Sequence, residues 1–135
     1  MADVTDVDFN QGIFAPGDII SVDSSRIIHT PSSFARTSLF YLQETGTLQA
    51  LRPHTSKRNG LDSFLFCAVM SGSGTLQYEK KEYGLHPGAC VFIDCRKPYA
   101  HSTGEDLWKL KWVHFSGSNM RGIYEKYCSR GGTPV

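Results

Sequence analysis

The sequence predicts an all-β domain, a sandwich or barrel of short strands, followed by one short helix. Stretches of strand character recur about every ten residues between positions 38 and 117, with Gly or Pro between them. In residues 108–114 every second side chain is apolar or aromatic until His114, and Lys109 and Lys111 stand between them. Successive strand side chains point to opposite faces, so this stretch has one dry and one wet face. Regular short strands with such patterning are typical of antiparallel sandwiches and barrels.

Composition limits the class of protein. A chain of 135 residues is long enough for one domain with a buried core, and 40% apolar with 20% charged residues is typical of a soluble globular protein. The net charge of +1 argues against a surface built to neutralise many phosphates. No secretory signal or membrane span is predicted, so we expect a cytoplasmic protein. The four cysteines form no CxxC pair and are interpreted as reduced structural thiols.

After the amino-terminal arm, the first half of the chain holds three of the expected strands. Residues 1–36 lack a sustained period and are predicted to form a leading arm with one short strand. Strands are predicted at 38–42 and 47–51, joined as a hairpin. Residues 53–60 are polar and predict a loop. Residues 63–70 are apolar on both faces, which predicts a strand that is covered on both sides.

Besides the alternating residues 108–114, the second half predicts four further short strands, the last of them at 99–102, and then the helix. A turn at residues 80–82 and a Pro-Gly turn at 86–89 separate strands that start near Thr75, Tyr83 and Cys90. The helix begins with Ser118 or Asn119 as its N-cap. Its apolar side is predicted to carry Met120, Ile123, Tyr124 and Tyr127.

Three segments together resemble a known family. Residues 84–101 read as a strand, a Pro-Gly turn, a buried strand and Pro-x-x-His, and residues 108–117 read Trp-x-x-x-Trp-Val-His-Phe-x-Gly. Residues 58–74 add a loop arginine, an apolar strand and Gly-Ser-Gly. Across residues 38–117 the chain resembles the amino-terminal effector domain of the AraC-type transcription regulators. The resemblance implies a cupin-like jelly-roll barrel that binds a small-molecule effector.

The resemblance also implies a division of the chain. We expect an amino-terminal arm at 1–36, a cupin-like barrel at 37–117, and at 118–135 a helix and tail that lead to a DNA-binding domain absent from this chain. DNA would then be a partner only through that absent domain. A helical dimerisation element is typical of the family, so a homodimer is a further expectation.

The candidate ligand-binding residues are Arg58, His101, Thr103, Trp108, Leu110 and Trp112. Two indoles offer aromatic faces, and an arginine offers a planar fork of donors to hydroxyls or a carboxylate. Positions like those of Trp112 and Arg58 line the effector pocket in the family, and the residues after the histidine approach it from the side. The residues themselves leave plainer interpretations open, because a barrel Trp is often core and a loop Arg is often exposed. His114 is expected to be structural.

Two function classes are alternatives to a sensor of a sugar or small polar metabolite. A metal-dependent cupin enzyme needs histidines and a carboxylate in its first-motif strand, and residues 64–69 contain neither. No metal, cofactor or catalytic residue is therefore predicted, and the chain is not expected to be an enzyme. A dimerisation module with a filled barrel predicts no cavity beside Trp112. In the sensor hypothesis the arm is a candidate lid.

Overall fold

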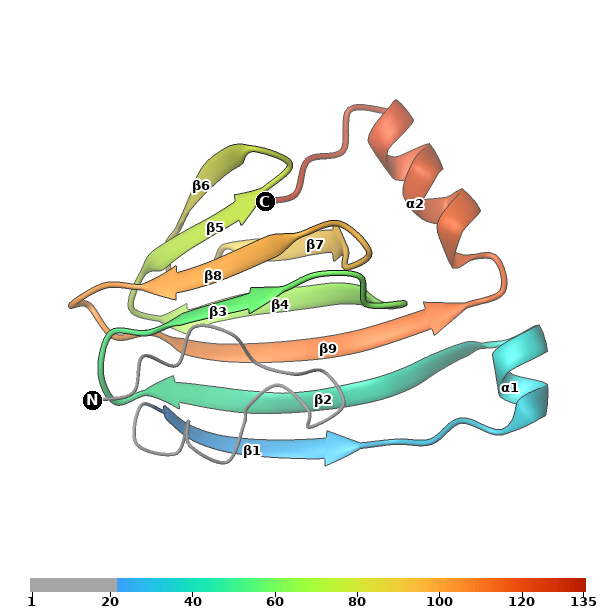
Figure 1. Ribbon diagram of the computed structural model, residues 1–135, viewed down its shortest axis with the longest axis horizontal. Helices are drawn as coiled ribbons and strands as arrows, with labels where there is room; N and C mark the ends of the chain where they lie inside the picture. The colour runs from blue at the N-terminus through green and yellow to red at the C-terminus, as the bar shows by residue number, and fades with distance from the viewer. Residues whose placement is uncertain (1–21) are drawn as a thin grey trace.

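A computed structural model of the chain describes residues 22–135, so the greater part of the predicted arm lies outside it. Two antiparallel sheets face each other and enclose the core (Figure 1). The larger sheet holds, in spatial order, β1 (Val22–Ile28), β2 (Phe40–Ala50), β9 (Lys109–Gly117), β4 (Phe64–Ser71) and β7 (Cys90–Asp94). The smaller sheet holds β3 (Thr55–Arg58), β8 (Tyr99–Thr103), β5 (Gly74–Tyr78) and β6 (Lys81–Leu85). The predicted all-β barrel is confirmed.

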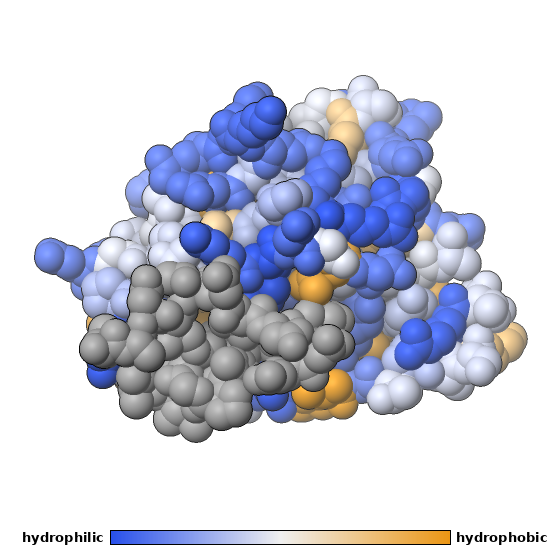
Figure 2. Space-filling model, in the orientation of Figure 1, coloured by the Kyte–Doolittle hydropathy of each residue, from blue (hydrophilic) through white to orange (hydrophobic). Residues whose placement is uncertain are grey.

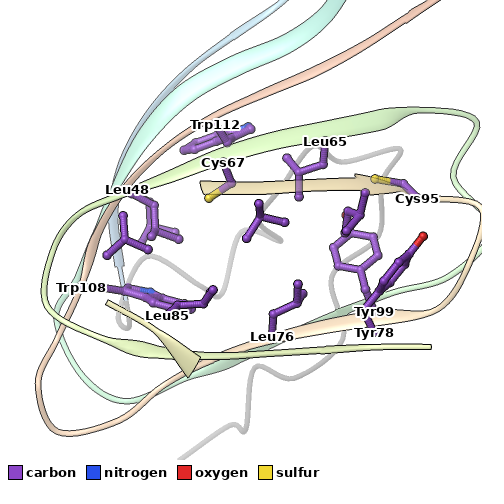
Figure 3. Close-up of a cluster of buried hydrophobic side chains, with 14 of the residues drawn as sticks. Leu48, Leu65, Cys67, Leu76, Tyr78, Leu85, Cys95, Tyr99, Trp108 and Trp112 are labelled. Carbon is purple, nitrogen blue, oxygen red and sulfur yellow. The ribbon is translucent and has the colours of Figure 1, made fainter. Parts of the chain in front are cut away.

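The central strand of the larger sheet is β9, which pairs with β2 on one side and β4 on the other. Its alternation is as predicted: Leu110, Trp112 and His114 are buried, whereas Lys109 and Lys111 are exposed. Trp108, directly before the strand, is fully buried. The inward residues join one core cluster with side chains from both sheets (Figure 3). In that cluster Trp108 and Trp112 lie toward one end and Tyr78 and Tyr99 toward the other.

Two predicted turns are present. Glu79 and Lys80 have φ values of 50° and 64°, so two left-handed residues close the β5–β6 hairpin, slightly earlier than predicted. Gly88 has a φ of 88° in the turn before β7, a conformation that glycine adopts without a steric penalty. The first turn keeps β5 and β6 in the smaller sheet, and the second leads the chain to β7 in the larger sheet.

The predicted hairpin between residues 38 and 51 is wrong, because β2 is one continuous strand of 11 residues. It pairs along its length with β9, with one irregularity between Leu42 and Glu44. The hairpin turn was predicted at Gly46 because glycine is common in turns. A Cβ at this position would lie 2.7 Å from the Trp112 ring, so this glycine makes room for an indole rather than for a turn.

The prediction that residues 63–70 are covered on both sides is also wrong. Leu65, Cys67 and Val69 are buried in the barrel, but Phe66 is 43% exposed and Met70 48% exposed on the other face. Helix packing reaches only the beginning of β4. Much of the surface visible in Figure 2 is hydrophilic, with separate apolar patches.

Two helices flank the larger sheet. The short α1 (Ser33–Ser38) follows β1, and α2 (Met120–Ser129) follows β9 with Asn119 as its N-cap. Met120 and Tyr124 of α2 are buried against Phe64 of β4 and the partly buried Phe92 and Phe115. The other two residues expected on this side remain partly exposed, Ile123 at 44% and Tyr127 at 36%.

The tail after α2 folds back onto the sheet. Gly131 has a φ of 87° at the helix end. The amide of Phe92 in β7 then donates to the carbonyl of Pro134 at 2.9 Å. Tyr127 contacts the Phe92 ring at 5.0 Å between centroids and donates its hydroxyl proton to the Thr133 carbonyl. The tail therefore lies against β7, an outer strand of the larger sheet.

Candidate functional site

A small cavity of about 20 Å³ lies inside the barrel, between the two sheets. It is lined by side chains of five strands, β2, β3, β4, β8 and β9. They are Leu48, Ser56, Arg58, Leu65, Cys67, Tyr99, His101, Leu110, Trp112 and His114. Four of the six sequence-predicted site residues, namely Arg58, His101, Leu110 and Trp112, thus come together here. A cavity this size holds about one water molecule.

Arg58 lies inside the barrel and not in a polar loop. The predicted loop at 53–60 contains β3, which pairs with β8, and Arg58 is only 7% exposed. Its guanidinium Nη1 donates to the Ser56 hydroxyl at 3.1 Å and to the Lys57 carbonyl at 2.9 Å. The strand escaped prediction because its inward residues, Ser56 and Arg58, are polar, so the usual apolar alternation is missing.

His101, one strand away on β8, is half-buried and contacts Tyr99 and Trp108 edge-on, with ring centroids 5.4 and 6.3 Å away. Its Nε2 atom is inaccessible to water and has no hydrogen-bond partner among the described residues. Burial, with the positive charge of Arg58 and the neighbouring His54, lowers the pKa of His101 to about 4. His101 is therefore neutral at pH 7.

His114 comes to the cavity from β9, and the sequence analysis assigned it only a structural role. Its Nδ1 is 3.1 Å from the Ser63 hydroxyl. Burial, with Arg58 and His101 nearby, lowers its pKa to about 3. Since both histidines are neutral, Arg58 carries the formal positive charge of the cavity at pH 7. Neither Asp nor Glu is among the cavity residues.

The apolar wall of the cavity is formed by Trp112 and Leu110 of β9, which are 4% and 7% exposed. Trp108 and Thr103 stand apart from this wall. Trp108 packs over Gly74, where a Cβ would lie 2.4 Å from its ring. The Thr103 hydroxyl donates to the Ser73 carbonyl at 3.2 Å. Their roles in ligand binding stay predictions.

Sequence reasoning missed other cavity residues for a physical reason. Tyr99 and Ser56 come from short strands of the smaller sheet, and Leu48 and Leu65 look like ordinary core residues. Strand alternation could have indicated that His114 faces inward with Trp112, since the two positions differ by two. No local signal shows that β3 and β9 meet across the barrel.

The chemistry available in the cavity is that of binding. Arg58 can donate charge-assisted hydrogen bonds, a neutral imidazole can donate one and accept one, and an indole face can pack against C–H groups. Within residues 22–135, no three His, Cys, Asp or Glu side chains are grouped so that they could hold a metal ion. Burial also raises the pKa of the Cys67 thiol to about 12, which keeps it protonated.

Solved structures similar to this chain include cupin domains and transcription regulators. The cupin domain of an XRE family regulator from Enterobacter cloacae aligns with a TM-score of 0.55 at 11% identity, covering 70% of this chain and 95% of that one. The Schizosaccharomyces pombe Cnp3 cupin domain gives 0.56 at 9%, covering 83% and 72%. An HTH_3 family regulator from Vibrio cholerae gives 0.58 at 11%, covering 73% and 52%. At these identities the similarity establishes the cupin fold.

The sequence itself gives the family. Residues 41–133 match the AraC-like ligand binding domain, and the chain belongs to this family. No curated protein matches the sequence. None of the helices in the described part of the chain is long and apolar enough to cross a membrane.

Proposed function

We propose that the barrel is the effector sensor of a transcription regulator and binds a small polar metabolite in the cavity between Arg58, His101 and Trp112. Membership of the AraC-like ligand binding domain family supports an effector-binding regulatory role and not an enzymatic one. The observation that carries the ligand chemistry is the buried guanidinium of Arg58 among the residues that line the cavity. A cation so placed favours an acceptor-rich or anionic group.

The residues around Arg58 favour one of the expected ligand classes, small acids or sugars, over the other. The residues around Arg58 are neutral histidines, hydroxyls, a thiol and apolar groups. Leu110 stands on the β9 face, where a polar side chain would suit the hydroxyls of a sugar. A small carboxylic acid with an apolar or ring-shaped body therefore suits the cavity better than a neutral sugar. Its carboxylate would accept from Arg58, and its body would pack on Trp112.

Ligand entry requires side chains to move, because the cavity now holds only about one water molecule. The half-buried His101 and the partly polar β3 are the nearest elements that could shift. Ligand binding would change the position of β9. His114 of this strand lines the cavity, and the next residue, Phe115, packs toward α2. A ligand that prefers one arrangement of β9 would shift the packing of α2, and regulation would follow from that difference in affinity.

The rest of the expected organisation remains part of this proposal. DNA would be contacted by a separate domain, because α2 of the described part is turned with Met120 and Tyr124 onto its own sheet. The partly exposed Ile123 and Tyr127 would then be available for homodimer contacts. The division into an arm at 1–36, a barrel at 37–117 and a helix and tail at 118–135 is proposed on the same basis, with β1 of the arm hydrogen-bonded to β2. A cytoplasmic location is likewise proposed.

A thermal-shift screen against small carboxylic acids and sugars tests the function. A ligand at 100 times its Kd stabilises the fold by about 2.7 kcal/mol, a measurable rise in Tm. We expect an acid to give this rise, and Arg58→Met to abolish it. The neighbouring exposed residue supplies the matched control, since Lys57→Met should leave the response unchanged.

The small cavity favours a second candidate, a dimerisation module whose barrel is filled by side chains. That function predicts no rise in Tm with any compound in the panel. It also predicts a tight dimer in sedimentation at all ligand concentrations. A response that survives Arg58→Met would contradict the proposed binding mode while leaving a sensor function in place.

A further inference from the structure

Ser56 of β3 and His101 of β8 lie directly opposite each other on the inner face of the smaller sheet. The two strands are neighbours in this sheet (Figure 1), and both side chains line the internal cavity. Side chains opposite each other on paired strands have Cβ atoms about 4.5–5.5 Å apart. A single polar group of a ligand placed between them can therefore contact both side chains.

The polar atoms of this pair have hydrogen-bonding capacity left for a ligand. The Nε2 atom of His101 is inaccessible to water and has no hydrogen-bond partner among residues 22–135. The Ser56 hydroxyl accepts from Nη1 of Arg58 at 3.1 Å, and a hydroxyl that accepts a hydrogen bond still has its own proton to donate. A buried polar atom without a partner destabilises the fold, so a ligand group that pairs with Nε2 adds favourable free energy to binding.

Two further ring nitrogens near His101, Nδ1 of His54 and Nε1 of Trp108, are also buried without a hydrogen-bond partner in the described part of the chain. The carbonyl of His54 accepts from the Thr103 amide at 3.0 Å, so His54 lies one diagonal step from His101 on the same face of the sheet. The centroids of the Trp108 and His101 rings are 6.3 Å apart. Native interiors leave few polar atoms unpaired, so three in one place indicate a position for a polar group of the ligand.

The protonation states of these rings indicate which polar group fits. Burial lowers the pKa of His54, and lowers that of His101 to about 4, so both imidazoles are neutral at pH 7. A neutral imidazole has one donor and one acceptor nitrogen, and an indole N–H only donates. A hydroxyl matches this set, since it donates one hydrogen bond and also accepts, whereas a carboxylate only accepts. A hydroxyl therefore suits this position with either tautomer of His101.

The position for the hydroxyl is next to the position for the carboxylate. Arg58 follows Ser56 by two residues on β3, so both side chains point into the barrel, and the guanidinium contacts the Ser56 hydroxyl directly. A carboxylate on the guanidinium and a hydroxyl between Ser56 and His101 would therefore lie side by side. Within one small molecule, substituents on adjacent carbon atoms have this arrangement.

We propose that Ser56 and His101 bind a hydroxyl group on the carbon next to the ligand carboxylate, so that the barrel selects 2-hydroxy acids. This inference rests on the proposed function, because Arg58 has to bind the carboxylate. With the body of the ligand against Trp112, the protein contacts three different substituents of one carbon atom. Such a set of contacts distinguishes the two enantiomers of a 2-hydroxy acid.

Binding of matched acids to the full chain tests this assignment. Mandelate and phenylacetate differ only in the 2-hydroxyl group, and lactate and propionate form the same pair with a smaller body. We expect one enantiomer of the hydroxy acid to bind about ten to a hundred times more tightly than the acid without the hydroxyl, the effect of leaving one buried hydrogen-bonding group unpaired. Isothermal titration calorimetry measures each dissociation constant.

The readout for the variants is the ratio of the two dissociation constants. His101→Phe keeps a ring and removes both nitrogens, so the ratio should fall below about threefold, and Ser56→Ala should lower it as well. A loss of packing alone would weaken both acids equally and leave the ratio unchanged. The matched control is Thr55→Val, since the Thr55 hydroxyl bonds to Ser102 on the other face of the sheet. Thermal unfolding first establishes that each variant is folded.

Three results would overturn the inference. Equal binding of the acids with and without the hydroxyl, abolished for both by Arg58→Met, would leave the proposed function in place and assign the Ser56–His101 pair to an ordered water molecule. A preference for the hydroxy acid that survives both His101→Phe and Ser56→Ala would place hydroxyl recognition elsewhere. Binding of none of the four acids would overturn the inference together with the acid-binding mode of the proposed function.

Discussion

The barrel interior and the cluster beneath α2 are both buried, but their composition differs. Beneath α2, Phe64, Met120 and Tyr124 pack with Phe92 and Phe115, and aromatic centroids lie 5.1 to 6.3 Å apart. The barrel interior instead encloses Arg58, two neutral histidines and a small cavity. Burying a charged or polar group costs free energy that an apolar side chain would not.

The difference in composition separates residues that stabilise the fold from residues that are available to bind a ligand. The aromatic cluster fixes α2 on the sheet, and Arg121 of α2 adds a contact 5.7 Å above the Phe64 ring and a salt bridge to Asp94. The polar end of the barrel contributes less to stability than an apolar core of the same volume would. Its residues are therefore best explained by what they could bind, and this comparison can be measured directly.

The largest effect is expected in the aromatic cluster. Phe64→Ala removes a ring that is 2% exposed and contacts Tyr124 at 5.4 Å. Loss of a buried phenylalanine should lower the free energy of unfolding by about 3–5 kcal/mol. Urea denaturation measures it. The matched control is Phe66→Ala two residues away, where the 43% exposed ring should cost less than about 1 kcal/mol. Equal losses at both positions would contradict the assignment of Phe64 to a buried cluster.

The next effect is a dependence of stability on acid. The pKa of His101 is about 4 in the folded protein and near 6.5 in the unfolded chain, so the unfolded chain binds more protons between these values. The contribution of His101 to the free energy of unfolding should be fully present above pH 6.5 and fall by about 3 kcal/mol toward pH 4. His114, with a pKa of about 3, should add a similar loss over the same range and continue it to about pH 3. Denaturation at a series of pH values measures the slope.

His101→Gln provides the control for that slope, since glutamine keeps hydrogen-bonding capacity without titrating. The variant should retain the loss due to His114 and show a shallower slope between pH 6.5 and 4. An unchanged slope would mean that His101 is not shielded from water in the folded protein.

The smallest effect on stability is expected at Arg58. Arg58→Met keeps much of the side-chain volume and removes the free-energy cost of burying a charged group, which offsets the loss of the hydrogen bonds that the guanidinium donates. The free energy of unfolding should stay within about 1 kcal/mol of the parent value, although Arg58 donates to Ser56 and Lys57. A loss as large as that of Phe64→Ala would contradict the division between fold and ligand residues.

Much of the fold could be predicted from the sequence where residue type and geometry agree. The alternation around Trp112 predicted β9 because one face of this strand is apolar and the other carries lysines. The hairpin turn at Glu79 and Lys80 and the helix capped by Asn119 were close to their observed positions. Local chemistry determines these features, so a local pattern reveals them.

The sequence predictions were wrong where the conformation of a residue depends on a neighbour from a distant part of the chain. Gly46 looks like a turn residue but lies under the Trp112 ring, and Arg58 looks like a loop residue but points into the barrel. Arg58, His101, Leu110 and Trp112 line one cavity, and their role in ligand binding stays a prediction. The inclusion of His114 depends on how β9 and β3 face each other, which residue spacing alone does not specify.

The most direct measurement is the structure of the chain bound to the compound that gives the largest thermal shift. The account predicts electron density inside the barrel, with a polar group of the compound within hydrogen-bond distance of Arg58 or His101 and its body against Trp112. Density only on the outer surface, with the barrel interior unchanged, would contradict the account.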